Sequence, residues 1–271
     1  MFSITRSENP IIDIGANLTH ESFSNDFAAV TERARQANIS HLIITGSDIK
    51  DSAKAIALAT ENTKLFSATA GIHPHHADQY STTSHQELER LLQLDIVKAV
   101  GETGLDFFRD ISPRDQQIES FLAHLTLAEK FNKPLFLHQR QAHDTFLEIL
   151  KEHRNSVGDV VVHCFTDTAE ALQDYLELDC YIGITGWICD ERRGAHLLDC
   201  VNSIPLNRLM IETDAPYLMP RNLRPKPKTR RNEPCNLPVV LEAIASARTE
   251  SAEELARAST ENAIRFFALQ Q

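Results

Sequence analysis

The chain has 271 residues, 42% of them hydrophobic and 24% charged, and its formal net charge is -11. This length suits two ordinary domains or one large α/β barrel, and a chain of this size can bury a full core without disulfides. The five cysteines are odd in number and lack paired or zinc-finger spacing, which argues against a disulfide framework and a structural zinc site. The negative charge repels polyanions, so nucleic-acid binding would require a local basic surface or metal ions.

The N-terminal residues MFSITRSENP lack the apolar stretch of a signal peptide. No segment of the chain approaches the ~20 consecutive apolar residues that a membrane-spanning helix requires. We therefore expect a soluble protein that has no membrane partner and that resides in the reducing cytoplasm.

Eight short aliphatic runs, taken in chain order, predict eight β-strands. The runs are near-continuous and do not alternate with polar residues, which is typical of strands covered on both faces. They begin at Ile11, His41, Leu65, Val97, Pro134, Asp159, Tyr181 and Leu209. Amphipathic stretches between them predict helices, several of which open with Ser, Thr or Asp as an N-cap. These stretches cover residues 22–37, 48–61, 113–131 and 168–178.

The alternation of strands and helices predicts a (β/α)8 TIM barrel that forms one domain, residues 1–271. A doubly wound sheet is the alternative, but no GxGxxG or GxxxxGKS/T motif follows the first strand, as nucleotide-binding sheets require. A basic, proline-rich stretch at residues 221–234 follows the last strand, where a barrel places a loop at its mouth.

Polar side chains stand at the downstream ends of four of these strands. They are Glu102, His138, His163 and Asp214. Parallel strands of a barrel bring such ends to one mouth, where imidazoles and carboxylates can bind a divalent ion that activates water. Each residue alone is more often a buried, hydrogen-bonded polar group than a ligand, but the set predicts a metal centre in a metal-dependent hydrolase.

Other candidates surround this set. Asp106 is expected to hold a loop or to orient a histidine. Arg140 could neutralise a phosphate or pair with Glu102 or Asp106. Cys164 is expected to point away from His163, because side chains alternate along a strand.

The stretch at 221–234 carries six cations, among them Arg221 and Arg224, which could contact a nucleic-acid backbone or only solubilise a loop. Three aromatic side chains, Trp187, Phe107 and Phe108, follow the seventh and fourth strands and could stack on unpaired bases or close the barrel.

Five motifs together resemble one enzyme family. They are GETGLDF, LHQR, VVHCFT, YIGITGW and IETDAPYL, in this order and at this spacing. They resemble the TatD family of metal-dependent deoxyribonucleases, within the amidohydrolase-like barrel superfamily, over nearly the whole chain from Ile12 to about Phe267. The resemblance implies an amidohydrolase-like TIM barrel that hydrolyses phosphodiester bonds of DNA with a divalent metal.

The same resemblance implies roles for single residues. Asp214 would touch the metal and accept the proton of the attacking water, whereas a helix N-cap is its structural alternative. His73 would act at the leaving oxygen and His75 on a phosphate, unless GIHPHH is merely a histidine-rich surface loop.

The first strand departs from many family members, which carry an HxH pair at its end. Here the segment reads DIGANLT, as in the TatD branch proper. Fewer imidazoles shift the expected ion towards Mg²⁺, with Mn²⁺ and Zn²⁺ as alternatives. Asn17 could contact substrate or could stabilise the turn after the strand.

These observations together predict a nuclease of DNA degradation or repair. We expect a monomeric 3'-5' exonuclease that prefers single-stranded DNA, since a narrow barrel mouth admits a strand end more easily than a duplex. The residues leave the polarity and the choice between DNA and RNA open. Two alternatives are a metal-dependent amide or ester hydrolase, such as an aminoacyl-tRNA deacylase, and a catalytically silent barrel that binds nucleic acid or protein.

Overall fold

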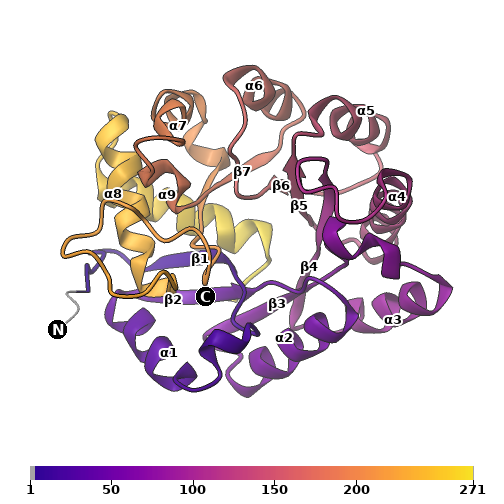
Figure 1. The fold of residues 1–271 in the computed structure, drawn as a ribbon, viewed down its shortest axis with the longest axis horizontal. Helices are drawn as coiled ribbons and strands as arrows, with labels where there is room; N and C mark the ends of the chain where they lie inside the picture. The colour runs from indigo at the N-terminus through magenta and orange to yellow at the C-terminus, as the bar shows by residue number, and fades with distance from the viewer. Residues whose placement is uncertain (1–3, 271) are drawn as a thin grey trace. The chain divides into compact units, whose positions relative to one another are not determined.

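Eight β-strands alternate with helices in the computed structural model, which describes residues 4–270 (Figure 1). The strands form one sheet in chain order, as in a (β/α)8 barrel. They are β1 Ile11–Ala16, β2 Ile39–Ile44, β3 Phe66–Ala70, β4 Val97–Asp106, β5 Leu135–Arg140, β6 Val160–Val162, β7 Tyr181–Ile184 and β8 Leu209–Ile211. The α-helices are α1 Phe27–Gln36, α2 Ile49–Glu61, α3 Thr82–Leu92, α4 Arg114–Phe131, α5 His143–His153, α6 Ala169–Glu177, α7 Ala195–Cys200, α8 Leu237–Ala247 and α9 Ala252–Phe266.

All eight predicted strands are present, but several of them end earlier than predicted, among them β6 and β8. β6 ends at Val162 and β8 ends at Ile211, so His163 and Asp214 follow their strands. The reason is local: Cys164 and Asp214 have φ values of 48° and 52°, in the left-handed region that a strand cannot include. The strand alternation on which the expectation for Cys164 rested is therefore absent, and its direction relative to His163 stays a prediction.

The first predicted helix also begins later than expected. Residues Glu21–Phe23 form a separate 3-10 turn, and α1 starts only at Phe27. The helix predicted at 48–61 is confirmed as α2, with the Asp48 side chain accepting a hydrogen bond from the Asp51 amide as an N-cap. Among residues 4–270, no helix is both long and apolar enough to cross a bilayer.

The chain divides into two compact units, which we describe separately. The first unit contains residues 4–43, 164–168 and 182–270, and the second contains residues 44–163 and 169–181. The second unit therefore carries β3 to β6, and the first carries β1, β8 and most of β2 and β7. That residues 1–271 act as a single domain stays a prediction.

Two glycines let β4 pass close to β5 in the second unit. Gly101 and Gly104 have φ values of 146° and 134°, which side-chain-bearing residues rarely adopt. A Cβ atom on Gly104 would lie 2.0 Å from the His138 carbonyl oxygen, and one on Gly101 would lie 2.2 Å from the Phe136 carbonyl oxygen. This close approach places Glu102, between the two glycines, beside the end of β5.

The ends of β1 and β8 meet in the first unit. The Asn17 amide donates to the Ala215 carbonyl at 2.7 Å, and the Asp214 amide donates to the Gly15 carbonyl at 2.8 Å. Ala16 and Ala215 form an isolated parallel bridge at the same place. The segment that carries Asp214 is therefore fixed by the backbone of β1.

Candidate metal centre

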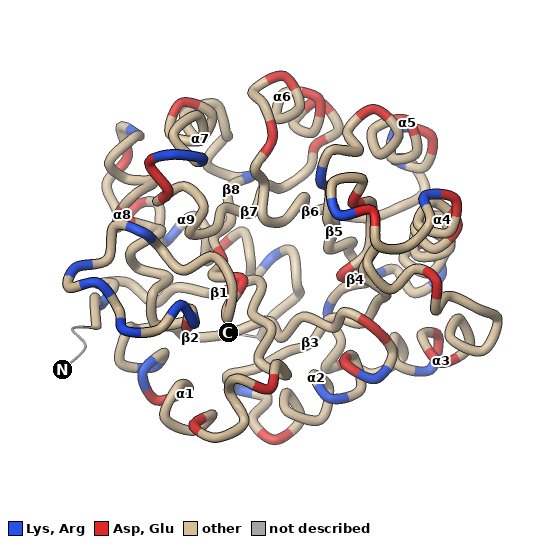
Figure 2. Tube along the Cα trace, viewed as in Figure 1, with Lys and Arg blue, Asp and Glu red and all other residues tan. Residues whose placement is uncertain are grey.

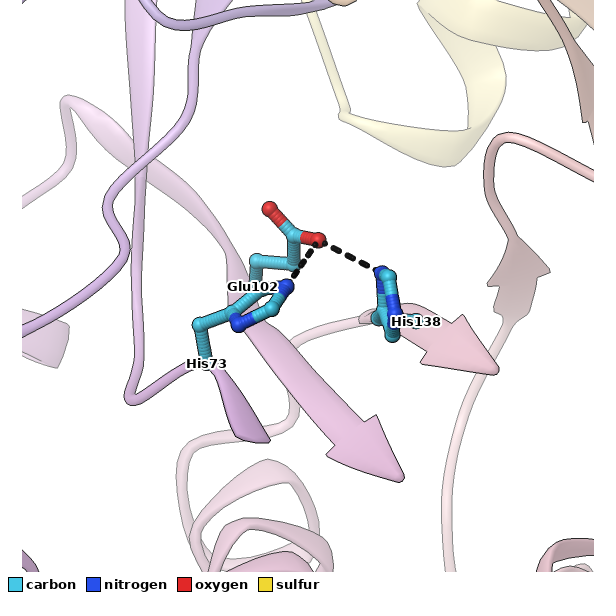
Figure 3. A group of neighbouring side chains, drawn as sticks. All are labelled: His73, Glu102 and His138. Carbon is cyan, nitrogen blue, oxygen red and sulfur yellow. Dashed lines mark hydrogen bonds and ion pairs between the residues drawn. The ribbon is translucent and has the colours of Figure 1, made fainter. Parts of the chain in front are cut away.

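One carboxylate oxygen of Glu102 gathers three imidazoles in the second unit. Its Oε1 atom lies 2.8 Å from His163 Nε2, 3.1 Å from His138 Nδ1 and 3.2 Å from His73 Nε2. Figure 3 shows two of these contacts, with the His73 and His138 rings reaching the same oxygen. Glu102 and His163 are buried, so this carboxylate and its imidazoles form a compact group shielded from solvent.

Each member of this group is placed by a different strand end. Glu102 lies within β4, His138 within β5, and His163 directly after β6, where its amide donates to the Leu137 carbonyl. His73 follows β3 and caps the 3-10 helix η2, Pro74–Gln79. Parallel neighbours explain the convergence, since β4 pairs with β5, with a register shift between Val100 and Thr103, and β5 pairs with β6.

Asp106, at the end of β4, contacts two histidines at this group. Its Oδ2 atom lies 2.8 Å from His75 Nε2 and 3.3 Å from His138 Nε2. Its Oδ1 atom accepts the backbone N–H groups of Phe108 and Arg109 at 3.0 and 2.7 Å. Asp106 therefore holds the loop after β4 and orients two histidines, as the sequence suggested.

The charges of these residues follow from burial and from one another. Burial raises the pKa of Glu102, but the surrounding imidazoles outweigh burial and hold its pKa well below the ordinary value. Burial also lowers the pKa of His138, yet its contacts with Asp106 and Glu102 leave that pKa raised. The two carboxylates thus favour the protonated form of His138, and a proton and a metal ion would compete at this position.

His73 differs from His138 because it is uncharged. Burial lowers its pKa to about 4, and its attraction to Glu102 only partly offsets this. Its Nδ1 atom accepts the His75 amide at 3.0 Å, so the ring proton resides on Nε2 and is donated to Glu102. A metal ion at Nε2 would displace that proton, so this tautomer suits a hydrogen-bond donor better than a ligand.

The donor set fits a divalent ion. One ligand atom from each of His73, Glu102 and His138 lies within 4.8 Å of the others, and such a group could hold a metal ion. Imidazole nitrogens and carboxylate oxygens are ligands for Mn²⁺ and Zn²⁺, and carboxylates for Mg²⁺. A buried, ionised carboxylate surrounded by nitrogen donors is a local arrangement that a cation stabilises.

Asp214 is held in the first unit by hydrogen bonds from β1 and the turn after it. The Asn17 side-chain amide donates to Asp214 Oδ1 at 2.8 Å, and the Tyr217 amide donates to the Asp214 carbonyl at 2.9 Å. The alternative that Asp214 caps a helix is wrong, because a turn follows it and α8 begins only at Leu237. Asn17 thus orients a carboxylate in this structure.

Sequence reasoning missed Asp13, which also holds the segment that carries Asp214. It is fully buried, and its carboxylate accepts the amide and the hydroxyl of Thr213 at 2.9 and 2.5 Å, and the Gly15 amide at 3.3 Å. Burial raises its pKa to about 7, although these hydrogen bonds oppose the shift. A lone acid inside the apolar run IIDIG was the signal available in the sequence.

The predicted substrate-binding arginines have different surroundings. The Arg140 guanidinium lies 4.0 Å from the Phe108 ring centroid, whereas the sequence suggested Glu102 or Asp106 as its partner. Arg221 Nε lies 3.7 Å from Asp190 Oδ1, and Arg224 donates to the carbonyls of Arg221 and Leu223. Their roles towards a substrate stay predictions.

A family model described as TatD related DNase matches residues 12–268. The chain belongs to this family. A TatD protein from Edwardsiella piscicida, named 3'-5' ssDNA/RNA exonuclease TatD, is 48% identical over 259 residues, covering 96% of this chain and all of the relative. The resemblance inferred from the five motifs is therefore confirmed.

Solved structures of TatD proteins share the fold. A TatD homologue from Escherichia coli is 29% identical with a TM-score of 0.87, and covers 96% of this chain and 98% of its own. A TatD family hydrolase from Entamoeba histolytica is 28% identical with a TM-score of 0.86, and covers 99% of this chain and all of its own. The predicted TIM barrel is confirmed. The ligand and catalytic roles of single residues stay predictions.

Proposed function

We propose that this TatD family member is a metal-dependent 3'-5' exonuclease of single-stranded DNA or RNA. The observation that carries the proposal is the contact of three imidazoles with one buried oxygen of Glu102. Family membership supports hydrolysis of DNA, and the name of the Edwardsiella relative supports the polarity and the single-stranded substrate.

Four residues are proposed as metal ligands: Glu102, His138, His163 and Asp214. Mg²⁺ is the proposed ion, and Mn²⁺ and Zn²⁺ are the alternatives that the same donors admit. When bound, such an ion lowers the pKa of water and polarises the phosphoryl group. Glu102 contributes negative charge to the site, while the raised pKa of His138 means that a proton competes with the metal ion for this ligand.

Asp214 and His73 are proposed to handle protons and hydrogen bonds of the reaction. Asp214 accepts the proton of the attacking water, and the Asn17 amide supports this role by fixing the carboxylate that it contacts. His73 offers an uncharged Nε2–H group to the leaving oxygen, which agrees with its lowered pKa. His75 and Arg140 are proposed to contact phosphates near this site.

An oligonucleotide assay tests the function. Single-stranded DNA and RNA labelled at the 5' or the 3' end would be digested with Mg²⁺, Mn²⁺ or Zn²⁺ and compared with EDTA. We expect a metal-dependent ladder of 5'-labelled products, and immediate release of the label from 3'-labelled strands. An absence of cleavage with every ion, combined with turnover of an aminoacyl ester, would reject the nuclease proposal in favour of an esterase.

We also propose that the enzyme is a monomer that works in the cytoplasm on DNA degradation or repair. The unpaired spacing of its cysteines supports a reducing compartment. Light scattering on purified protein would test the oligomeric state, and a mass twice that of the chain would contradict it.

A further inference from the structure

A basic pocket lies in the first unit between the segments that follow β7 and β8. Its volume is about 770 Å³. One wall begins with the 3-10 helix η3, Gly186–Cys189, and continues through residues 190–193, and the other is residues 218–230. A Cβ on Gly186 would lie 2.2 Å from the Leu218 carbonyl oxygen, so the two walls touch at their base.

Positive charge dominates this pocket in a chain whose net charge is -11. Seven of the lining residues are cationic and two are acidic, Asp190 and Glu191. Figure 2 shows part of this charge as blue segments along the connection from β8 to α8. The cations are Arg192, Arg193, Arg221, Arg224, Lys226, Lys228 and Arg230.

One buried carboxylate ties the two walls together. Asp190 is 2% exposed, and its oxygens lie 2.9 Å from Arg193 NH2, 3.8 Å from Arg192 Nε and 3.7 Å from Arg221 Nε. A single negative charge therefore holds three guanidinium groups, two from the first wall and one from the second. Since it can neutralise only one of them, the pocket keeps an excess of positive charge.

Three cations of the second wall have no acidic partner. Within the described residues, 4–270, Lys226, Lys228 and Arg230 form no ion pair and are exposed to solvent. Arg231 differs, because it pairs with Asp26 and Glu233 at 2.7 Å and stabilises the base of the loop. Lys226, Lys228 and Arg230 are thus available to a ligand, whereas Arg231 is structural.

The second wall is anchored beside Asp214. Asn232, at the end of the basic loop, donates its amide to the Pro216 carbonyl at 2.9 Å and its side-chain amide to the Thr213 carbonyl at 3.0 Å. The loop therefore leaves the Asp214 segment and returns to the same segment. A nucleic-acid strand that binds this loop would therefore contact a part of the chain that is connected directly to Asp214.

The pocket also offers a flat surface. The Arg193 guanidinium stacks on the Trp187 ring at 4.3 Å from its centroid, and the Trp187 Nε1–H group donates to the Arg193 carbonyl at 3.4 Å. Planar guanidinium and indole groups stack on unpaired bases of any sequence. Backbone cations combined with a stacking surface are typical of single-strand binding.

We infer that the basic pocket binds the phosphodiester backbone of the substrate strand at nucleotides other than the one being removed. This inference rests on the proposed exonuclease function. Its consequence is that long strands bind more tightly than short ones, because only long strands have nucleotides beyond the one being removed.

Binding in EDTA tests the pocket without cleavage. The triple variant Lys226→Ala, Lys228→Ala, Arg230→Ala would be compared with Arg35→Ala, Arg90→Ala, Lys130→Ala, which removes three cations from exposed ion pairs on helices. Both variants change the net charge equally. For a fluorescent single-stranded 20-mer, we expect the pocket variant alone to lose about tenfold in affinity, with a salt slope shallower by about 2, since each phosphate contact contributes roughly 0.7.

Trp187 supplies a second readout, because it is the only tryptophan in the sequence. Adding the unlabelled 20-mer should change its emission in the wild type, and a dinucleotide at the same concentration should change it much less. Equal affinity losses in the two triple variants would overturn the inference that the pocket binds the strand. Tryptophan emission that does not change when the 20-mer is added would also overturn it. A wild type that binds as expected but cleaves no strand with any metal would instead reject the exonuclease function and leave the pocket standing.

Discussion

Glu102 organises the candidate centre at the scale of single residues. One of its oxygens receives contacts from three imidazoles, so the charge of this side chain, and not only its size, holds the group together. Removing the charge leaves the three rings without the electrostatic attraction that holds them at one oxygen.

Glu102→Gln keeps the size of the side chain but not its charge. We expect nuclease activity to fall by at least about 100-fold, because the negative charge of a proposed metal ligand that also holds three imidazoles is lost. Glu89→Gln is the matched control, since Glu89 forms an exposed ion pair with Lys130 on the protein surface. Initial rates on the 3'-labelled strand measure both, and a Glu102→Gln enzyme with half of the wild-type rate would contradict the role.

Metal binding should depend on pH through His138. Its raised pKa means that the metal-free site binds a proton there more readily than an ordinary histidine does, and this proton must leave before the nitrogen can bind an ion. The apparent dissociation constant should therefore rise about tenfold for each unit that the pH falls below the His138 pKa. Calorimetry in two buffers of different ionisation enthalpy measures the released protons. Binding that releases no proton at acid pH would show that His138 is not a ligand.

The same shift has the opposite sign for stability. A histidine whose folded pKa exceeds its unfolded value stabilises the metal-free protein fully below the unfolded value. That contribution is lost as the pH rises through the folded pKa. Metal-free protein should thus gain stability from His138 in acid, where metal affinity is weakest.

The site residues that could be predicted from the sequence are those whose proposed metal-binding side chains follow an apolar run. Glu102, His138 and His163 each end an apolar run in the sequence, and the structure brings them together. The role of Asp13 was not predictable, because it depends on a contact with a distant residue, although an acid inside an apolar run marks the position. Asp13 contacts Thr213, 200 positions away, and no local pattern in the sequence encodes such a pair.

At the scale of elements, β4 determines how the centre is built. Its two glycines allow the strand to approach β5, and the residue between them is Glu102. The motif GETG is therefore a backbone requirement as well as a chemical one.

Gly104→Ala tests this approach. A methyl group there would lie 2.0 Å from the His138 carbonyl oxygen at a strained φ of 134°, so β4 and β5 would have to separate. We expect a loss of about 2 kcal/mol or more in the free energy of unfolding, together with weaker metal binding. Gly158→Ala is the control, since a Cβ there meets no atom within 4 Å. Urea unfolding measures both, and equal midpoints would refute the steric argument.

Elements were predicted well in their order and less well in their ends. Aliphatic runs revealed all eight strands, since burial on both faces leaves a plain hydrophobic signal. The early ends of β6 and β8 could not be predicted, because they depend on the left-handed backbone conformations of Cys164 and Asp214. Nothing in these two residue types requires that conformation. The 3-10 turn at Glu21–Phe23 was likewise absorbed into the predicted helix.

At the scale of the whole molecule, a bound ion should stabilise the fold. An ion that binds only the native state adds about 2.7 kcal/mol at a concentration 100 times its dissociation constant. Melting temperatures with and without Mn²⁺ or Mg²⁺ measure this gain, with KCl at equal ionic strength as the control. EDTA should reverse the shift and Glu102→Gln should abolish it. A wild-type melting temperature that no divalent ion raises would remove the case for a metal centre.

The basic loop begins and ends on the segment that carries Asp214, through the hydrogen bonds of Asn232. Residues between the two attachment points of such a loop can be exchanged while the attachment points stay unchanged. Enzyme engineers could therefore graft longer or less basic inserts between these two points to retune strand preference and working ionic strength, and leave the hydrolytic chemistry in place.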